Sequence, residues 1–170
     1  MLEITTRRLR LAPFTPEQMK RAVTDPSGAA AEIGAKFTEY DKGGADMRLI
    51  YERRLELILK RPEQWLFSTM WQIVLLSTGE LAGELGFKGI LPGAETEVGY
   101  SVRNAFSGRG LMTEALGGLL EFAGTRQYAY IDRVSALTQP YNKASMRVLE
   151  KNGFVNEGRR FALLYWVRKI

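Results

Sequence analysis

The stretch Ser107-Gly108-Arg109-Gly110-Leu111-Met112-Thr113 is a glycine loop that separates two different sequence patterns. Residues 97–102 before it are apolar and β-prone, and apolar residues after it recur at helical spacing, so we predict a strand, a loop and a helix over 110–125. The two glycines permit positive φ, and the free amides and dipole of a helix start favour a phosphate or pyrophosphate. A tight turn without a ligand would use the same glycines, so the loop alone leaves both interpretations open.

Further motifs surround this loop. Val134 to Thr138 predicts another strand, and the helical pattern from Met146 to Lys151 ends at Asn152-Gly153. The string Asn142-x-x-Ser145-x-x-Val148-Leu149-Glu150-Lys151-Asn152-Gly153-Phe154 closely resembles the closing motif of the GCN5-related N-acetyltransferases, the GNAT family. Thr6 to Phe14 is similar to the first strand of the branch that acetylates ribosomal-protein N-termini, and Gly79 to Phe87 is similar to the family's central hairpin.

The resemblance covers nearly the whole chain in the family's order, apart from about residues 25–64. It implies a single α/β domain over residues 1–170, with a mixed, mostly antiparallel sheet and flanking helices. The strands at 97–102 and 134–138 would be parallel and would splay apart. It also implies an acetyl-CoA-dependent N-acetyltransferase that moves an acetyl group to a primary amine, either a protein N-terminus or a small amine.

The same resemblance implies the coenzyme site. Backbone groups near Tyr100 and Val102 would hold pantetheine in the gap between the splayed strands, and Asn142 would bond pantetheine or a bridging water. The residues expected to form the pyrophosphate loop are Ser107, Gly108, Arg109, Gly110, Leu111, Met112 and Thr113. Ser107 stands where the family usually has Gln or Arg, and Met112 where it usually has Gly or Ala. These departures keep a second function open, a non-catalytic acyl-CoA-binding regulatory or interaction module.

Acetyl transfer from a thioester needs an unprotonated amine, a stabilised oxyanion and a proton for the departing thiolate. Glu97 is the candidate base by resemblance, with a pKa that an apolar cleft would raise; a solvated strand residue is the alternative. Ser145 is the candidate proton donor to the thiolate, and Tyr141 is the alternative donor. Asn142 and Ser145 could instead serve only to cap a helix.

Composition narrows the chemistry. The chain of 170 residues has neither cysteine nor histidine, which excludes disulfides, thiolate nucleophiles and the commonest general base, and argues against a metal site. Residues 101–170 hold eleven Lys or Arg against five Asp or Glu, a surplus suited to an anionic coenzyme. The basic residues are scattered without interleaved aromatics, so we expect no nucleic-acid partner.

No stretch is apolar over a bilayer's thickness, and arginines interrupt the N-terminus, so we expect a soluble cytoplasmic protein without a membrane partner. We expect a monomer or a homodimer. Turn and capping signals predict further elements. These are a strand over Leu2–Leu11, a helix from Thr15 that Asp25-Pro26-Ser27-Gly28 breaks, a helix over Ala45–Leu59, a hairpin of Trp65–Leu76 with Glu80–Ile90, and a strand over Phe161–Val167.

Overall fold

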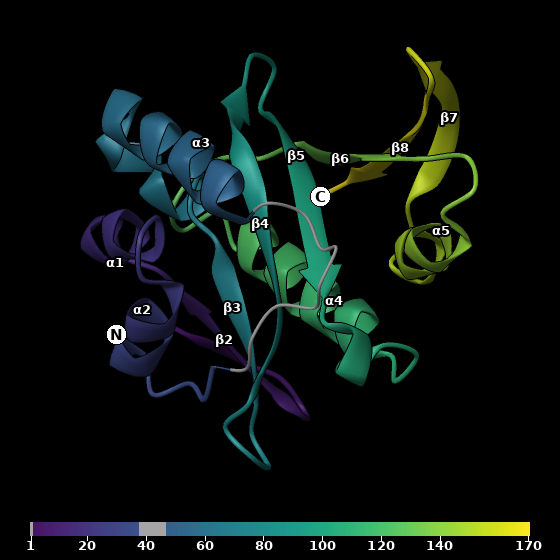
Figure 1. Ribbon diagram of the computed structural model, residues 1–170. Helices are drawn as coiled ribbons and strands as arrows, with labels where there is room; N and C mark the ends of the chain where they lie inside the picture. Colours follow the sequence, from purple (N-terminus) through teal and green to yellow (C-terminus); the bar gives the residue numbers. More distant parts are fainter. Residues whose placement is uncertain (1, 38–46) are drawn as a thin grey trace.

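The computed structural model describes residues 2–37 and 47–170, and its strands form one eight-stranded sheet (Figure 1). The strands are β1 (Ile4–Thr5), β2 (Leu9–Pro13), β3 (Trp71–Leu75), β4 (Leu81–Leu91), β5 (Glu95–Val102), β6 (Arg133–Thr138), β7 (Val155–Arg160) and β8 (Leu163–Lys169). The α-helices are α1 (Pro16–Ala22), α2 (Pro26–Glu32), α3 (Met47–Lys60), α4 (Leu111–Gly124) and α5 (Lys143–Lys151). Two short 3-10 helices are η1 (Pro62–Phe67) and η2 (Asn104–Phe106).

The sheet has the order β1-β2-β3-β4-β5-β6-β8-β7. All neighbouring strands are antiparallel except β5 and β6, which are parallel. The helix α4 makes the crossover between these two strands, as a parallel connection requires. The predicted fold class, a mostly antiparallel mixed sheet with one parallel pair and flanking helices, is confirmed.

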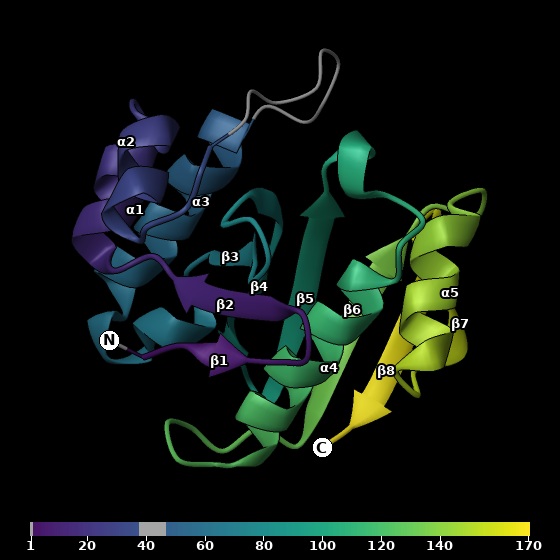
Figure 2. The same cartoon turned by 90° about the horizontal axis from the view of Figure 1, so that it is seen from below.

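Helices cover both faces of the sheet. Figures 1 and 2 show α1, α2 and α3 on one face, and α4 on the other. One core cluster joins the apolar side of α4 to inward-facing residues such as Leu85, Phe87 and Val98. A second cluster packs α1, α2 and α3 against β2 and β3 through residues such as Phe14, Met19 and Tyr51. The two cores fix α3 and α4 on opposite sides of β4 and β5.

Three of the predicted elements need correction. The predicted strand Leu2–Leu11 is a hairpin of β1 and β2, because the Leu9 amide donates to the Thr6 hydroxyl across a turn (3.2 Å). Asp25-Pro26 does end α1, but it also begins α2: the Asp25 carboxylate accepts from the Gly28 amide (2.8 Å) and Pro26 takes the first helical position. The predicted strand over Trp65–Leu76 starts only at Trp71, because Pro62 begins η1.

Other boundaries move by a few residues. The helix predicted over Ala45–Leu59 is α3, and the first two predicted positions, 45 and 46, lie outside the described residues. The closing helix begins at Lys143, because Asn142 caps it. The last strand runs over Leu163–Lys169, since Phe161 occupies a turn with φ of 56°. The helix and strand that flank the glycine loop lie where the sequence predicts them.

Candidate active site

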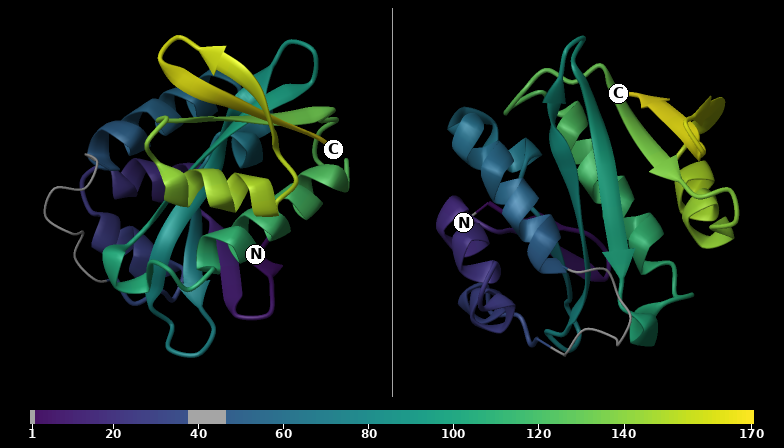
Figure 3. Two further views of the ribbon diagram at one scale, coloured as in Figure 1. Left: turned by 90° about the vertical axis from the view of Figure 1, so that its right-hand side faces the viewer. Right: turned by 45° about the horizontal axis from the view of Figure 1, so that its top comes forward.

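The parallel strands β5 and β6 separate after a short paired stretch. Glu95, Thr96 and Glu97 pair with residues 133–135, but the described structure gives residues 98–102 no partner on β6. Figure 3 (right) shows the two strands diverging from this point. On its other side, β5 stays paired with β4 as far as Val102. The backbone edge of residues 98–102 that faces away from β4 is therefore available to a ligand.

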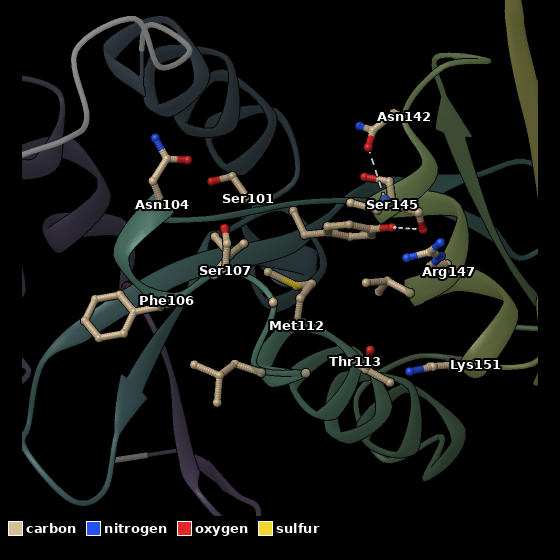
Figure 4. A pocket seen from close by; sticks show the side chains of 17 residues that line it. Ser101, Asn104, Phe106, Ser107, Met112, Thr113, Asn142, Ser145, Arg147 and Lys151 are labelled. Atoms are coloured by element: carbon tan, nitrogen blue, oxygen red, sulfur yellow. Dashed lines mark hydrogen bonds between the residues drawn. The ribbon is translucent and has the colours of Figure 1, made fainter.

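A cavity of about 630 Å³ lies in this gap (Figure 4). It is lined by every residue that the sequence predicts for coenzyme binding except Arg109, and by Ser145. The strand β5, the glycine loop, the start of α4 and the start of α5 each supply part of the wall. The structure thus brings together residues that lie more than forty positions apart, such as Tyr100 and Ser145, whose contact is described below.

The glycine loop presents a row of backbone amides to this cavity. Gly108 and Gly110 have φ of 74° and 72°, and Gly110 caps α4 without a side-chain hydrogen bond. Among the described residues, no group accepts a hydrogen bond from the amides of residues 108–113. These amides and the positive end of the α4 dipole make an anion cradle. The structure therefore fits a bound pyrophosphate.

The loop is held in place from the opposite side by Arg8. Its Nε donates to the Glu114 carboxylate (2.6 Å) and its Nη1 to the Arg109 carbonyl (3.0 Å). Burial alone would raise the pKa of Glu114, but hydrogen bonds from Thr6 and Arg8 outweigh it and lower the pKa. The Arg109 side chain is exposed and lies over the Phe106 ring, 5.6 Å from its centroid, outside the cavity wall. Arg109 thus contributes its backbone to the loop, and its side chain would have to turn to contact a ligand.

The first turn of α5 closes the cavity opposite β5. The Asn142 side chain accepts from the Ser145 amide (3.1 Å), so Asn142 caps the helix and lines the cavity at once. The Tyr100 hydroxyl donates to the Ser145 carbonyl (3.1 Å), as Figure 4 shows. Burial raises the pKa of Tyr100 to about 12, so its phenol is protonated at neutral pH. Tyr141 is 79% exposed and does not line the cavity.

Two cations on α5 were missed at the sequence level. Arg147 and Lys151 line the cavity, and Figure 4 shows both extending toward the start of α4. They are four residues apart, so they share a helix face. Ser145 and Val148 flank that face. The helical spacing of Arg147 and Lys151 relative to these two residues was therefore the sequence signal that could have placed both cations at the site. Met112, one of the departures from the family pattern, lines the cavity and packs into the main core, whereas Ser107, the other, is exposed at the cavity rim.

The candidate base Glu97 lies elsewhere. Its side chain pairs with Lys88, which lies on β4 in the irregular stretch between Phe87 and Ile90, and it does not line the coenzyme cavity. Its surroundings are therefore cationic, and the prediction that Glu97 lies near an apolar cleft needs this correction. Alternation along β5 places Glu97 on the same face as Gly99 and Ser101, toward α3.

A second cavity of about 440 Å³ occupies that face. Residues of α3 line one side and Lys88, Met70 and the β5 backbone line the other. Tyr100 and Ser101 belong to both cavities. Gly83 of β4 lies close to the backbone of Ser101 on β5. This approach requires glycine, because a Cβ at position 83 would collide with the Ser101 carbonyl oxygen. The two cavities thus meet across β5 where that strand has left β6.

A splayed parallel pair with an amide cradle beside it is an arrangement that suits an elongated anionic ligand between strands. A family model for the acetyltransferase (GNAT) domain matches residues 8–155. The chain therefore belongs to the GNAT family of N-acetyltransferases.

Sequence relatives carry acetyltransferase names. The chain is 34% identical over 110 residues to the probable N-acetyltransferase YjcK of Bacillus subtilis (strain 168), which covers 64% of this chain and 55% of that protein. It is 33% identical over 81 residues to the ribosomal protein uS5-alanine N-acetyltransferase of Escherichia coli (strain K12), which covers 46% of this chain and 41% of that protein. The alignments thus span about half the length of these relatives.

Solved structures share the fold. The ribosomal-protein-S5-alanine acetyltransferase from Vibrio fischeri superposes with a TM-score of 0.70 at 16% identity and covers 99% of this chain and 97% of its own. The ribosomal L7/L12 α-N-protein acetyltransferase RimL, in complex with coenzyme A, has a TM-score of 0.68 at 20% identity, with coverage of 99% and 98%. Within residues 2–37 and 47–170, no helix combines the length and hydrophobicity that crossing a bilayer requires.

Proposed function

We propose that this protein transfers the acetyl group of acetyl-CoA to a primary amine, a protein N-terminus or a small amine, by direct attack of the amine on the thioester. One observation carries the proposal: two cavities meet at Tyr100 and Ser101 of β5, and one of them has the amide cradle. A coenzyme in the first cavity and an amine in the second would bring thioester and nucleophile together at this junction. The relatives with acetyltransferase names and the neighbour bound to coenzyme A support the assignment.

In this proposal the amides of residues 108–113 hold the pyrophosphate, and Arg147 and Lys151 add positive charge beside it. The free backbone edge of β5 at Tyr100 and Val102 pairs with the pantetheine amides. A β5 N–H polarises the thioester carbonyl. This hydrogen bond strengthens as negative charge develops on the carbonyl oxygen.

Glu97 accepts the proton of the attacking amine, directly or through water. Its place on the face of β5 that carries the second cavity supports this role, and its contact with Lys88 joins it to that cavity wall. Ser145 gives a proton to the departing thiolate, because it lines the coenzyme cavity and lies on the first turn of α5. Tyr141 is the weaker candidate on the same argument, since its side chain points into solvent.

The test is thiol release from acetyl-CoA in the presence of protein and single amines. The panel contains peptides with free N-termini, amino acids, polyamines and aminoglycosides, and mass spectrometry identifies each acetylated product. Release above the acceptor-free rate, with a matching N-acetyl product, supports the proposal. Tight coenzyme binding with no release for any amine would favour the non-catalytic acyl-CoA-binding module instead. The cytoplasmic location, the absence of metal and nucleic acid, and the monomeric or homodimeric state stay predictions from the sequence.

A further inference from the structure

Three cations and no carboxylate line the second cavity within the described part of the chain. Arg53 and Arg54 come from α3, and Lys88 comes from β4. The rest of the wall is mostly apolar, with Met47, Ile50, Leu57 and Met70. A binding site of this composition suits a ligand that has an apolar body and a negative charge.

Arg54 places a positive charge in the wall of this cavity. Its side chain is buried and donates to the carbonyl oxygens of Phe87 and Gly86 on β4. Its Nη2 lies 3.9 Å from the position that a Cβ at Gly99 would take, so the guanidinium is next to β5. Burial lowers the pKa of Arg54 to about 10, with the charges of Glu97 and Glu84 acting in the opposite direction. The side chain is therefore cationic at neutral pH.

The two carboxylates near Arg54, Glu97 and Glu84, are each engaged by another side chain. Glu97 is engaged by Lys88, and Glu84 is buried and accepts a hydrogen bond from the Tyr51 hydroxyl (2.8 Å). Neither lines the cavity. Arg53 is exposed and forms no ion pair with any residue in the described ranges. Arg53 therefore leaves positive charge at the cavity that the two carboxylates do not compensate.

We propose that the acceptor is a primary amine that also carries a carboxylate beside an apolar body. This inference rests on the proposed function, since it names the substrate class of the same site. The carboxylate would accept charge-assisted hydrogen bonds from Arg53 or Lys88. The same cations repel ammonium groups, so they exclude polyamines and favour the neutral, reactive form of the bound amine. Two sources share this chemistry: a free amino acid and a peptide N-terminus followed by an acidic residue.

The turnover experiment compares pairs of acceptors in which only one member carries the carboxylate. One pair is L-methionine and L-methioninol, and the other is the amidated peptides Ala-Glu-Ala and Ala-Gln-Ala. For the preferred pair, Arg53→Gln should lower the ratio of kcat/KM between the charged and neutral member by about tenfold, the loss of roughly one charged hydrogen bond. Lys88→Gln should act in the same direction. Comparing ratios cancels the intrinsic reactivity of each amine and any general effect on Glu97.

Arg61→Gln is the matched control, since it removes the same charge just beyond α3 and outside the cavity. It should leave the ratio unchanged. The pair that shows the effect identifies the source, amino acid or peptide. Equal ratios in wild type and Arg53→Gln for both pairs, or faster acetylation of spermidine than of every charged acceptor, would overturn the inference while leaving the acetyltransferase activity established.

A binding experiment separates this inference from the proposed function. With coenzyme A present, N-acetyl-L-methionine should bind at least about tenfold more tightly than N-acetyl-L-methioninamide by calorimetry, and Arg53→Gln should remove the difference. For the peptide source, the N-acetylated peptides replace these two compounds. If these affinities hold but no amine is acetylated, the proposed function fails and the anion preference stands. If amines are acetylated but the two compounds of each pair bind equally, the anion preference fails.

Discussion

Gly110→Asp should abolish most coenzyme binding without unfolding the protein. Gly110 has φ of 72° and caps α4, and a Cβ there would meet no atom closer than Arg8 Nη2 at 3.8 Å. The new side chain therefore has space, and its conformational strain is about 1–2 kcal/mol. That strain lowers the melting temperature but does not itself remove the amide cradle.

The loss of affinity follows from charge. The aspartate carboxylate would lie at the cavity wall between the Arg8 guanidinium and the amides of residues 108–113, where it would compete with the pyrophosphate for those amides. It would also repel the phosphate charges, by about 1 kcal/mol per pair at 4 Å in water and about 4 kcal/mol near a protein surface. Even the lower figure, with two phosphates, corresponds to an affinity loss of about tenfold or more.

Isothermal calorimetry with coenzyme A measures the effect, and two variants separate its causes. Gly110→Ala introduces the strain without the charge and should weaken binding by less than about threefold. Gly153→Asp introduces both at a glycine with φ of 74° outside the cavity, and should bind as wild type does. Unchanged affinity in Gly110→Asp, at a melting curve that shows a folded protein, would refute the phosphate assignment. An equal loss in Gly110→Ala would show that backbone strain, not the anion cradle, controls binding.

Three further predictions concern proton transfer and stability. Glu97→Gln should lower kcat by ~10²-fold or more with nearly unchanged coenzyme affinity. The loss of kcat should be smaller at high pH, where the amine deprotonates unaided. Near wild-type turnover at neutral pH would remove Glu97 from the mechanism. Ser145→Ala should lower kcat more than coenzyme affinity, with Tyr141→Phe milder; the opposite order at equal melting temperature would make the tyrosine the proton donor. Burial alone would raise the pKa of Glu95, but hydroxyl hydrogen bonds and the Arg133 charge outweigh it and lower the pKa. The ionised Glu95 carboxylate therefore stabilises the folded protein fully above the ordinary pKa of 4.5, and this stabilisation is lost as the pH falls through the lower pKa of the folded state. Glu95→Gln should therefore make the stability less dependent on pH in acid unfolding measured by circular dichroism. An unaltered acid profile would contradict this.

The parts of the fold that the sequence predicts depend on local signals. Thr15-Pro16 begins α1 with the capping box that its spacing predicts, and the glycine loop lies between strand and helix as expected. The same rule, applied to Asp25-Pro26, would have found α2. The hairpin of β1 and β2 was missed because its turn depends on the Thr6 hydroxyl rather than on glycine or proline.

The position of Glu97 could not be predicted from local signals. Lys88 reaches Glu97 because Phe87, just before it on β4, pairs with Val98, just after Glu97 on β5. An irregularity between Phe87 and Ile90 then shifts the register of the two strands. A shift of one residue would turn the glutamate to the other face of the sheet. Sequence spacing gives neither the register nor the irregularity, so the pairing with Lys88 emerges only from the folded sheet.

The second cavity shows the same limit of prediction from sequence, here for residues of α3. Met47, Ile50, Arg54 and Leu57 recur at helical spacing, so they share one face, and the arginine is the charged member of an otherwise apolar stripe. This spacing is visible in the sequence, and it indicates a charged residue on the buried face of the helix. What it could not show was that this face lies over β5, beside the strand that leaves β6. Once both are known, the cations on and beside this face, Arg53 above all because the two carboxylates do not compensate it, become an argument about the charge of the acceptor.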